Sequence, residues 1–108
     1  MGFFSRLTGL FSARGRDDDR LVQGLAHAKA GRPEKAIEIY DALIAGSSKG
    51  DVIRARALFN RALAHSALKN DEQAINDLRE ALASPNLPEN VQAAARTQLA
   101  RVQKRNES

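Results

Sequence analysis

The feature that most constrains this chain is an internal repeat, in which two stretches match at an offset of 38 residues. Small residues recur opposite small residues, and most of the large apolar residues recur opposite other large apolar residues. The matching pairs are Gly24 and Ala62, His27 and His65, Ala36 and Ala74, Ile37 and Ile75, Tyr40 and Leu78, and Ile44 and Leu82. A small residue lets two helices approach closely, and large residues fill the space between them. The repeat therefore predicts two helical hairpins that stack on each other.

Turn-forming residues divide the rest of the pattern into helical segments. Gly31 ends the first segment, and Pro33 suits the first position of the next because proline has no amide hydrogen to lose there. Asp51 is expected to cap the third. The predicted helices cover residues 18–30, 33–45, 51–68, 71–83 and 89–104. β-branched residues are few and no segment alternates, so we predict an all-α fold.

The stretches GLAHAKAGRPEKAIEIYDALI and LFNRALAHSALKNDEQAINDLREALASP resemble tetratricopeptide repeats. Gly24 and Ala62 stand where the family has a small residue in the first helix of each repeat. In the second helix, Ala36 is followed four residues later by Tyr40, as the family pattern requires. The second repeat departs from that pattern, because Leu78 takes the aromatic position. The offset of 38 residues also exceeds the family period of about 34, and the resemblance covers residues 18–85.

The resemblance implies a right-handed solenoid of α–α hairpins in a domain over residues 17–108. Its repeats are expected at about 18–48 and 55–85, with a capping helix at 89–104. It also implies that the chain binds a protein partner, a peptide or a helix, in a concave groove lined by the first helix of each repeat. The groove residues are Leu21, Leu25, Lys29, Arg56, Phe59, Asn60, Leu63 and Ser66. This floor is mainly apolar, which favours a hydrophobic helix or extended segment over a charged peptide.

One subfamily of these repeats clamps the C-terminal carboxylate of heat-shock chaperones with a set of Lys and Asn residues. Asn60 matches one member of that set, but Leu21 and Leu25 stand where a Lys and an Asn are required. We therefore expect no carboxylate clamp. We expect Asn60 to bond to a neighbouring backbone group instead.

Residues 1–16 differ from the rest of the chain in charge and in pattern. They contain three arginines and no acid, and so account for three of the four net positive charges. Their large apolar residues fall on one stripe of a helix: Phe3, Phe4, Leu7, Leu10 and Phe11. We expect this amphipathic helix to end at Gly15, and we expect Asp17–Asp19 to begin a new one. The boundary of the repeat domain is therefore placed between Gly15 and Arg16.

The amphipathic segment is predicted to bind a membrane or a partner. The residues that would do so are Phe3, Phe4, Arg6, Leu7, Leu10, Phe11 and Arg14. Each large apolar side chain contributes about 1.5–3 kcal/mol if fully buried, and each arginine near an anionic surface only about 1 kcal/mol. The apolar contribution therefore dominates. The opening MGFFSRL resembles the membrane-contacting ends of several bacterial peripheral proteins.

Three occupants remain open for this stripe: a membrane surface, a groove or transmembrane helix of another protein, and the chain's own repeats. A secretory signal is excluded because the segment has no continuous apolar core.

No residue pattern points to catalysis, a metal or a cofactor. The chain has no Cys, and His27 and His65 have no acidic residue three or four positions away that would complete a metal site. Their shared place in the repeat predicts that both fill a packing slot between helices. The bases Arg96, Arg101, Lys104 and Arg105 form a stripe on the last segment, yet acids are interspersed and aromatic residues for base stacking are few. We therefore do not expect nucleic acid as a partner.

The sequence as a whole favours a non-enzymatic adaptor or scaffold, bacterial and cytoplasmic, held at a membrane or a membrane complex by residues 1–16. The alternative is a soluble scaffold that self-associates, with the N-terminal helix as the contact between copies.

Overall fold

A computed structural model describes the backbone of residues 2–107 and the side chains of residues 15–107. The helices are α1 (Gly2–Lys29), α2 (Pro33–Ala45), α3 (Val52–Ala67), α4 (Asp71–Ala83) and α5 (Glu89–Glu107). No strand occurs in this part of the chain, so the all-α prediction is confirmed. Pro33 begins α2 as predicted. Asp51 precedes α3 in an extended conformation, but its side chain makes no capping hydrogen bond.

The predicted helix end at Gly15 is wrong, because α1 runs without interruption from Gly2 to Lys29. A glycine inside a helix costs only about 1 kcal/mol relative to alanine, which is too little to break a helix by itself. No heavy atom lies within 4 Å of the position that a Cβ of Gly15 would occupy. Asp17–Asp19 therefore lie inside a long helix rather than at the start of a second one.

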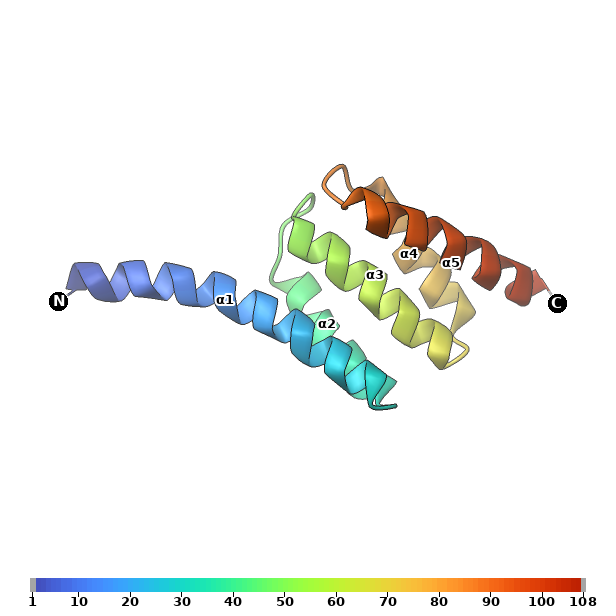
Figure 1. Ribbon diagram of the computed structural model, residues 1–108, viewed down its shortest axis with the longest axis horizontal. Helices are drawn as coiled ribbons and strands as arrows, with labels where there is room; N and C mark the ends of the chain where they lie inside the picture. The colour runs from blue at the N-terminus through green and yellow to red at the C-terminus, as the bar shows by residue number, and fades with distance from the viewer. Residues whose placement is uncertain (1, 108) are drawn as a thin grey trace.

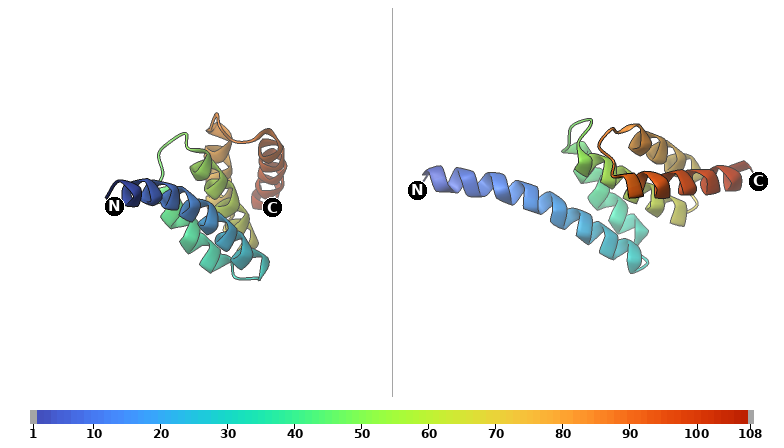
Figure 2. Two further views of the ribbon diagram at one scale, coloured as in Figure 1. Left: turned by 60° about the vertical axis from the view of Figure 1, so that its left-hand side comes forward. Right: turned by 45° about the horizontal axis from the view of Figure 1, so that its top comes forward.

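The helices form two layers. In Figure 1, α1, α3 and α5 lie toward the viewer, and α2 and α4 lie behind them. The molecule is elongated, with principal extents of 61 × 29 × 21 Å. The N-terminal half of α1 extends away from the other helices in Figure 1 and in the right-hand view of Figure 2. The first helices of the two hairpins therefore share one face, together with α5.

The matched small and large residues meet at the helix crossings, as the repeat predicts. In the first hairpin Gly24 is packed against Tyr40, whose ring is fully buried. A Cβ on Gly24 would lie 2.8 Å from Tyr40 Cζ, closer than carbon atoms approach. In the second hairpin Ala62 and Leu78 belong to one buried cluster. Burial also raises the pKa of Tyr40 to about 12.

The turns within the two hairpins are built alike. Gly31 and Lys69 occupy equivalent positions after α1 and α3, and both have positive φ, 79° and 63°. The residue after each donates its amide hydrogen to a histidine carbonyl, with Arg32 N 2.8 Å from His27 O and Asn70 N 2.9 Å from His65 O. The repeat in sequence is therefore also a repeat in turn geometry.

Candidate protein-binding groove

A shallow apolar cavity of about 330 Å³ lies between the middle of α1, the start of α3 and the start of α5. Its lining consists of Leu21, Val22, Leu25, Arg56, Phe59, Asn60, Asn90 and Val91. Three helices thus contribute to one concave site. Because its walls are mainly carbon, the cavity suits an apolar side chain of a ligand better than a charged one.

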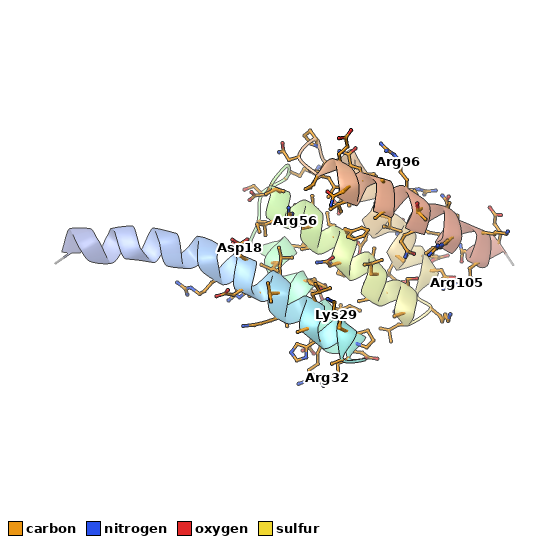
Figure 3. All side chains as sticks on the ribbon, viewed as in Figure 1. Asp18, Lys29, Arg32, Arg56, Arg96 and Arg105 are labelled. Atoms are coloured by element: carbon orange, nitrogen blue, oxygen red, sulfur yellow. The ribbon has the colours of Figure 1, made fainter. Side chains whose placement is uncertain are left out.

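A second apolar cavity, of about 470 Å³, lies beside the first, toward the C-terminal end of α1. It is lined by Leu25, Ala28, Lys29, Gly31, Pro33, Leu63, Ala64 and Ala67. Leu25 borders both cavities, so they form two halves of one groove. This pair of cavities is called the groove below. Figure 3 shows Lys29 on α1 and Arg56 on α3, the two exposed cations of its lining.

The structure brings together most of the residues predicted for the groove. The first cavity contains Leu21, Leu25, Arg56, Phe59 and Asn60, and the second contains Leu25, Lys29 and Leu63. Ser66 lines neither cavity. Its hydroxyl and its carbonyl oxygen accept hydrogen bonds from Arg105 Nη2, at 3.0 and 3.2 Å. Ser66 is thus engaged by α5 in this structure, and its predicted role in the groove stays a prediction.

Several residues of the groove were missed from the sequence. Val22 is the most exposed large apolar residue among the described side chains, at 67%. A signal for it existed, since Val22 is the repeat equivalent of Asn60, which the sequence did place in the groove. Asn90 and Val91 come from α5, outside the repeats, and only the packing of α5 reveals them.

The polar residues of the groove do not build a carboxylate clamp. Asn60 is half-buried, and its side chain makes no hydrogen bond within the part of the chain described. The expected bond to a neighbouring backbone group is therefore not formed. The amide of Asn60 lies in the wall of the first cavity, where a ligand would find both a donor and an acceptor.

An ion-pair network holds α3, the floor of the groove, against both helices behind it. Arg61 donates two hydrogen bonds to Asp77 on α4, each 2.8 Å long, and one to Asp41 on α2, also 2.8 Å. Asp77 is buried, and the guanidinium satisfies both of its oxygens. The hydrogen bond to Asp77 raises the pKa of Arg61, whereas burial acts in the opposite direction. The floor is therefore fixed by charge as well as by packing.

A second ion pair attaches α5 to the repeats. Arg105 Nη2 lies 2.6 Å from Asp71 Oδ1, in addition to its bonds to Ser66. This hydrogen bond lowers the pKa of Asp71 and raises the pKa of Arg105. One member of the predicted basic stripe on the last helix is thus a structural residue.

The two histidines occupy equivalent sites beside the hairpin turns, and both are half-buried. Arg32 Nε donates to His27 Nδ1 at 3.1 Å, and Asn70 Nδ2 lies 3.4 Å from His65 Nδ1. Burial lowers the pKa of His65, while the charge of Asp77 acts weakly in the opposite direction. Each histidine therefore ties the end of one helix to the residue that precedes the next.

The side chains predicted to bind a membrane or a partner lie outside the described side chains. They are Phe3, Phe4, Arg6, Leu7, Leu10, Phe11 and Arg14, and the backbone of α1 runs through all of them. No helix in the described chain is long and apolar enough to cross a membrane. The described residues also contain no group of His, Asp or Glu that could hold a metal ion.

Comparisons with known proteins agree with this arrangement. The family model for the tetratricopeptide repeat matches residues 13–51 and 21–90. A search of curated proteins and a search of solved structures each gave no match. The matched residues span both hairpins and include the groove residues of α1 and α3. The chain therefore belongs to the tetratricopeptide repeat family, whose repeats generally mediate protein–protein interactions.

Proposed function

We propose that this protein is a non-enzymatic adaptor, which binds an apolar helix or extended segment of a partner protein in the groove. The exposure of Leu25 supports this proposal most directly. Leu25 borders both cavities and is 38% exposed, although apolar neighbours surround it. An exposed apolar patch inside a concave site is typical of a surface that is covered in use.

The charged groups at the groove edge would orient the partner. Lys29 and Arg56 are exposed at its two ends, and the side-chain amide of Asn60 lies unpaired between them. A partner segment with apolar residues at helical spacing, an acidic residue near each end and a polar group between them would satisfy all three. The apolar contacts supply most of the affinity, because exposed ion pairs contribute little.

The groove is tested by photo-crosslinking inside intact cells that express the full chain. A photoreactive residue at Leu25 is expected to give a discrete cross-linked partner. The same residue at Glu38, an exposed position of α2, is the matched control and is expected to give none. Equal labelling from both positions, or no product from Leu25, would contradict the groove as the binding site.

We further propose that residues 1–16 tether the adaptor peripherally to an anionic membrane surface, in a bacterial cytoplasm. Two observations support this: the apolar stripe in the sequence, and the extension of this part of α1 beyond its partner helix. Insertion of the stripe would remove its large apolar side chains from water. The three arginines of the segment would favour anionic lipids.

The tether is tested by co-flotation of the full chain with anionic and with neutral vesicles. The wild-type protein is expected to float, and more strongly on anionic lipid. The double variant F4D/F11D places two charges on the stripe and is expected to lose flotation. The matched control S5D/S12D adds the same charge on the opposite side of the helix. It is expected to keep most of the wild-type flotation. Equal flotation of the two variants would refute insertion of the stripe.

A further inference from the structure

The backbone of α1 continues past the end of α2, the helix that packs beside its C-terminal half (Figure 1). The end of α2 lies beside Arg16, Asp17 and Arg20, which share a surface depression with Leu43 and Gly46. Residues 2–14 therefore continue beyond α2 for about 20 Å, at 1.5 Å per residue. Their backbone extends away from the other helices in Figure 1 and in the right-hand view of Figure 2. Residues 2–14 are called the projecting segment below.

The continuity of α1 places the stripe positions of the projecting segment in the same helix register as residues nearer its C-terminal end. Eighteen residues make about five full turns of an α-helix, so positions 3, 4 and 7 share their helix face with positions 21, 22 and 25. The latter are Leu21, Val22 and Leu25, the α1 wall of the groove. One face of α1 therefore carries the apolar stripe at one end and the exposed groove wall at the other.

We infer that two copies of this chain associate through α1 in antiparallel orientation, each projecting segment lying along the groove of the other. Placing the two-fold axis near residue 16 sets position i opposite position 32 − i. Leu7 then faces the partner's Leu25. Leu10 lies nearest the partner's Leu21, because the two-fold axis keeps each residue on its own side of the contact. This isologous contact covers the stripe and the groove wall of both copies at once.

Charge favours a second copy over a bilayer as the occupant of the whole face. Asp18 is exposed and lies on this same face, between the stripe and the groove wall. In Figure 3 it lies on α1, close to where the helix leaves the body. Against an anionic bilayer its carboxylate would be repelled and poorly solvated. In the antiparallel pair it faces the partner's Arg14, and the symmetry forms this ion pair twice.

The inference rests on the groove and the stripe of the proposed function. It adds that association of two copies regulates access to both. The stripe lies either in the groove of a second copy or on a membrane, so association in solution shields the tether and closes the groove. Membrane binding or a groove partner would then separate the copies. The dimer itself is measured without lipid or partner, so its failure is distinct from a failure of the adaptor proposal.

The first test exchanges the charges at positions 14 and 18 in the full chain. We expect the wild-type protein to be a dimer by light scattering at submillimolar concentration. Arg14→Glu and Asp18→Arg each place like charges opposite each other at both symmetric sites, and each is expected to weaken the dimer about tenfold. An equimolar mixture of the two variants restores opposite charges at both sites. It is expected to recover dimers near the wild-type affinity.

The mixture separates contacts between copies from contacts within one helix. Positions 14 and 18 are also neighbours along α1, but mixing leaves each chain's own pair unchanged. Recovery on mixing therefore requires residue 14 of one copy to meet residue 18 of the other. A monomeric wild-type protein, or variants that weaken the dimer without recovering when mixed, would overturn the inference.

The second test uses the absence of Cys from the chain. Leu7→Cys protein mixed with Leu25→Cys protein is expected to give a disulfide-linked heterodimer on mild oxidation. Either protein alone is expected to give little, because the antiparallel register places two copies of the same position far apart. Ser12→Cys mixed with Arg20→Cys is the control, since these positions obey the same register on the opposite side of α1. Equal cross-linking of both mixtures would contradict the proposed face.

Discussion

The two hairpins solve the same packing problem with different residues. At the first crossing a glycine faces a tyrosine, and at the second an alanine faces a leucine. The smaller residue accompanies the larger partner, so the volume at the crossing is conserved while its division changes. Close-packed interiors tolerate exchanges of this kind when total volume is kept. The comparison shows that the two repeats share the combined volume of the facing residues, and that the size of each single residue can differ.

The hairpins also differ in how many neighbours they have. The second lies between the first hairpin and α5, and it contains the buried Arg61–Asp77 pair. The equivalent positions in the first hairpin are Gln23, which is exposed, and Ile39, which is half-buried. Among the described helices, the first hairpin packs against the second hairpin on one side, and the exposed apolar residues of the groove lie on its first helix. The end of the array is therefore where a ligand gains most by covering apolar surface.

The largest expected effect comes from breaking the polar contact that only the second hairpin has. Asp77→Asn removes a buried charge and leaves Arg61 without its main partner, which we expect to cost about 3 kcal/mol of unfolding free energy. Asp41→Asn is the matched control. Its carboxylate pairs with the same guanidinium but is 55% exposed, so we expect less than about 0.5 kcal/mol. Urea denaturation measures both, and equal losses would show that burial of the pair is unimportant.

The same contact can be converted to its counterpart in the first hairpin. The double variant R61Q/D77I installs the residues found at positions 23 and 39. A buried ion pair replaced by uncharged residues of similar volume often costs little. We therefore expect R61Q/D77I to be more stable than Asp77→Asn, and a less stable double variant would contradict this equivalence.

The next effect comes from the packing of Gly24. Gly24→Ala adds a methyl group where Tyr40 already lies, and we expect a net loss of about 2 kcal/mol despite the better helix propensity of alanine. Gly15→Ala is the control, because nothing lies within 4 Å of its Cβ position, and it is expected to stabilise by up to about 1 kcal/mol. The pair G24A/Y40L copies the second hairpin and should recover most of the loss. No recovery would disprove the shared crossing geometry.

A smaller effect is expected at the hairpin turns. Lys69 has positive φ, a conformation that costs non-glycine residues about 1 kcal/mol. Lys69→Gly copies Gly31 of the first hairpin and is expected to stabilise by about that amount in thermal and urea unfolding. The reverse exchange, Gly31→Lys, is expected to destabilise by a similar amount. Effects of the same sign at both positions would contradict an equivalent turn.

The smallest effect concerns protonation of His65. Its pKa is lowered in the folded state, so the folded protein binds fewer protons than the unfolded chain near the ordinary histidine pKa of about 6.5. Its contribution to stability is therefore complete above that pH and is lost as pH falls through the folded pKa. His65→Gln is expected to flatten the dependence of unfolding free energy on pH below neutrality. His27→Gln serves as the comparison, and an identical flattening there would argue against burial of His65 as the cause.

Much of the fold could be predicted from local pattern. The small and large residues at matched positions predicted the hairpins, and Gly31 and Pro33 predicted the first turn. The continuation of α1 through Gly15 was not predictable in this way, because a single glycine and three aspartates have weak propensities that a continuing helix overrides. For the groove, the resemblance to tetratricopeptide repeats implied Leu25 and Phe59, which line the cavities. It did not reveal that α5 would engage Ser66 or add Asn90 to the wall.

The sequence by itself determined the helices, their pairing into two hairpins and the line of residues that faces the groove. These features depend on spacing along the chain and on the sizes of residues that recur at an offset of 38 residues. Only the tertiary structure decided that α1 continues past α2, that Arg105 of α5 binds Ser66, and which apolar residues stay uncovered. Those outcomes depend on the lengths and crossing of helices distant in sequence, and no local pattern encodes them.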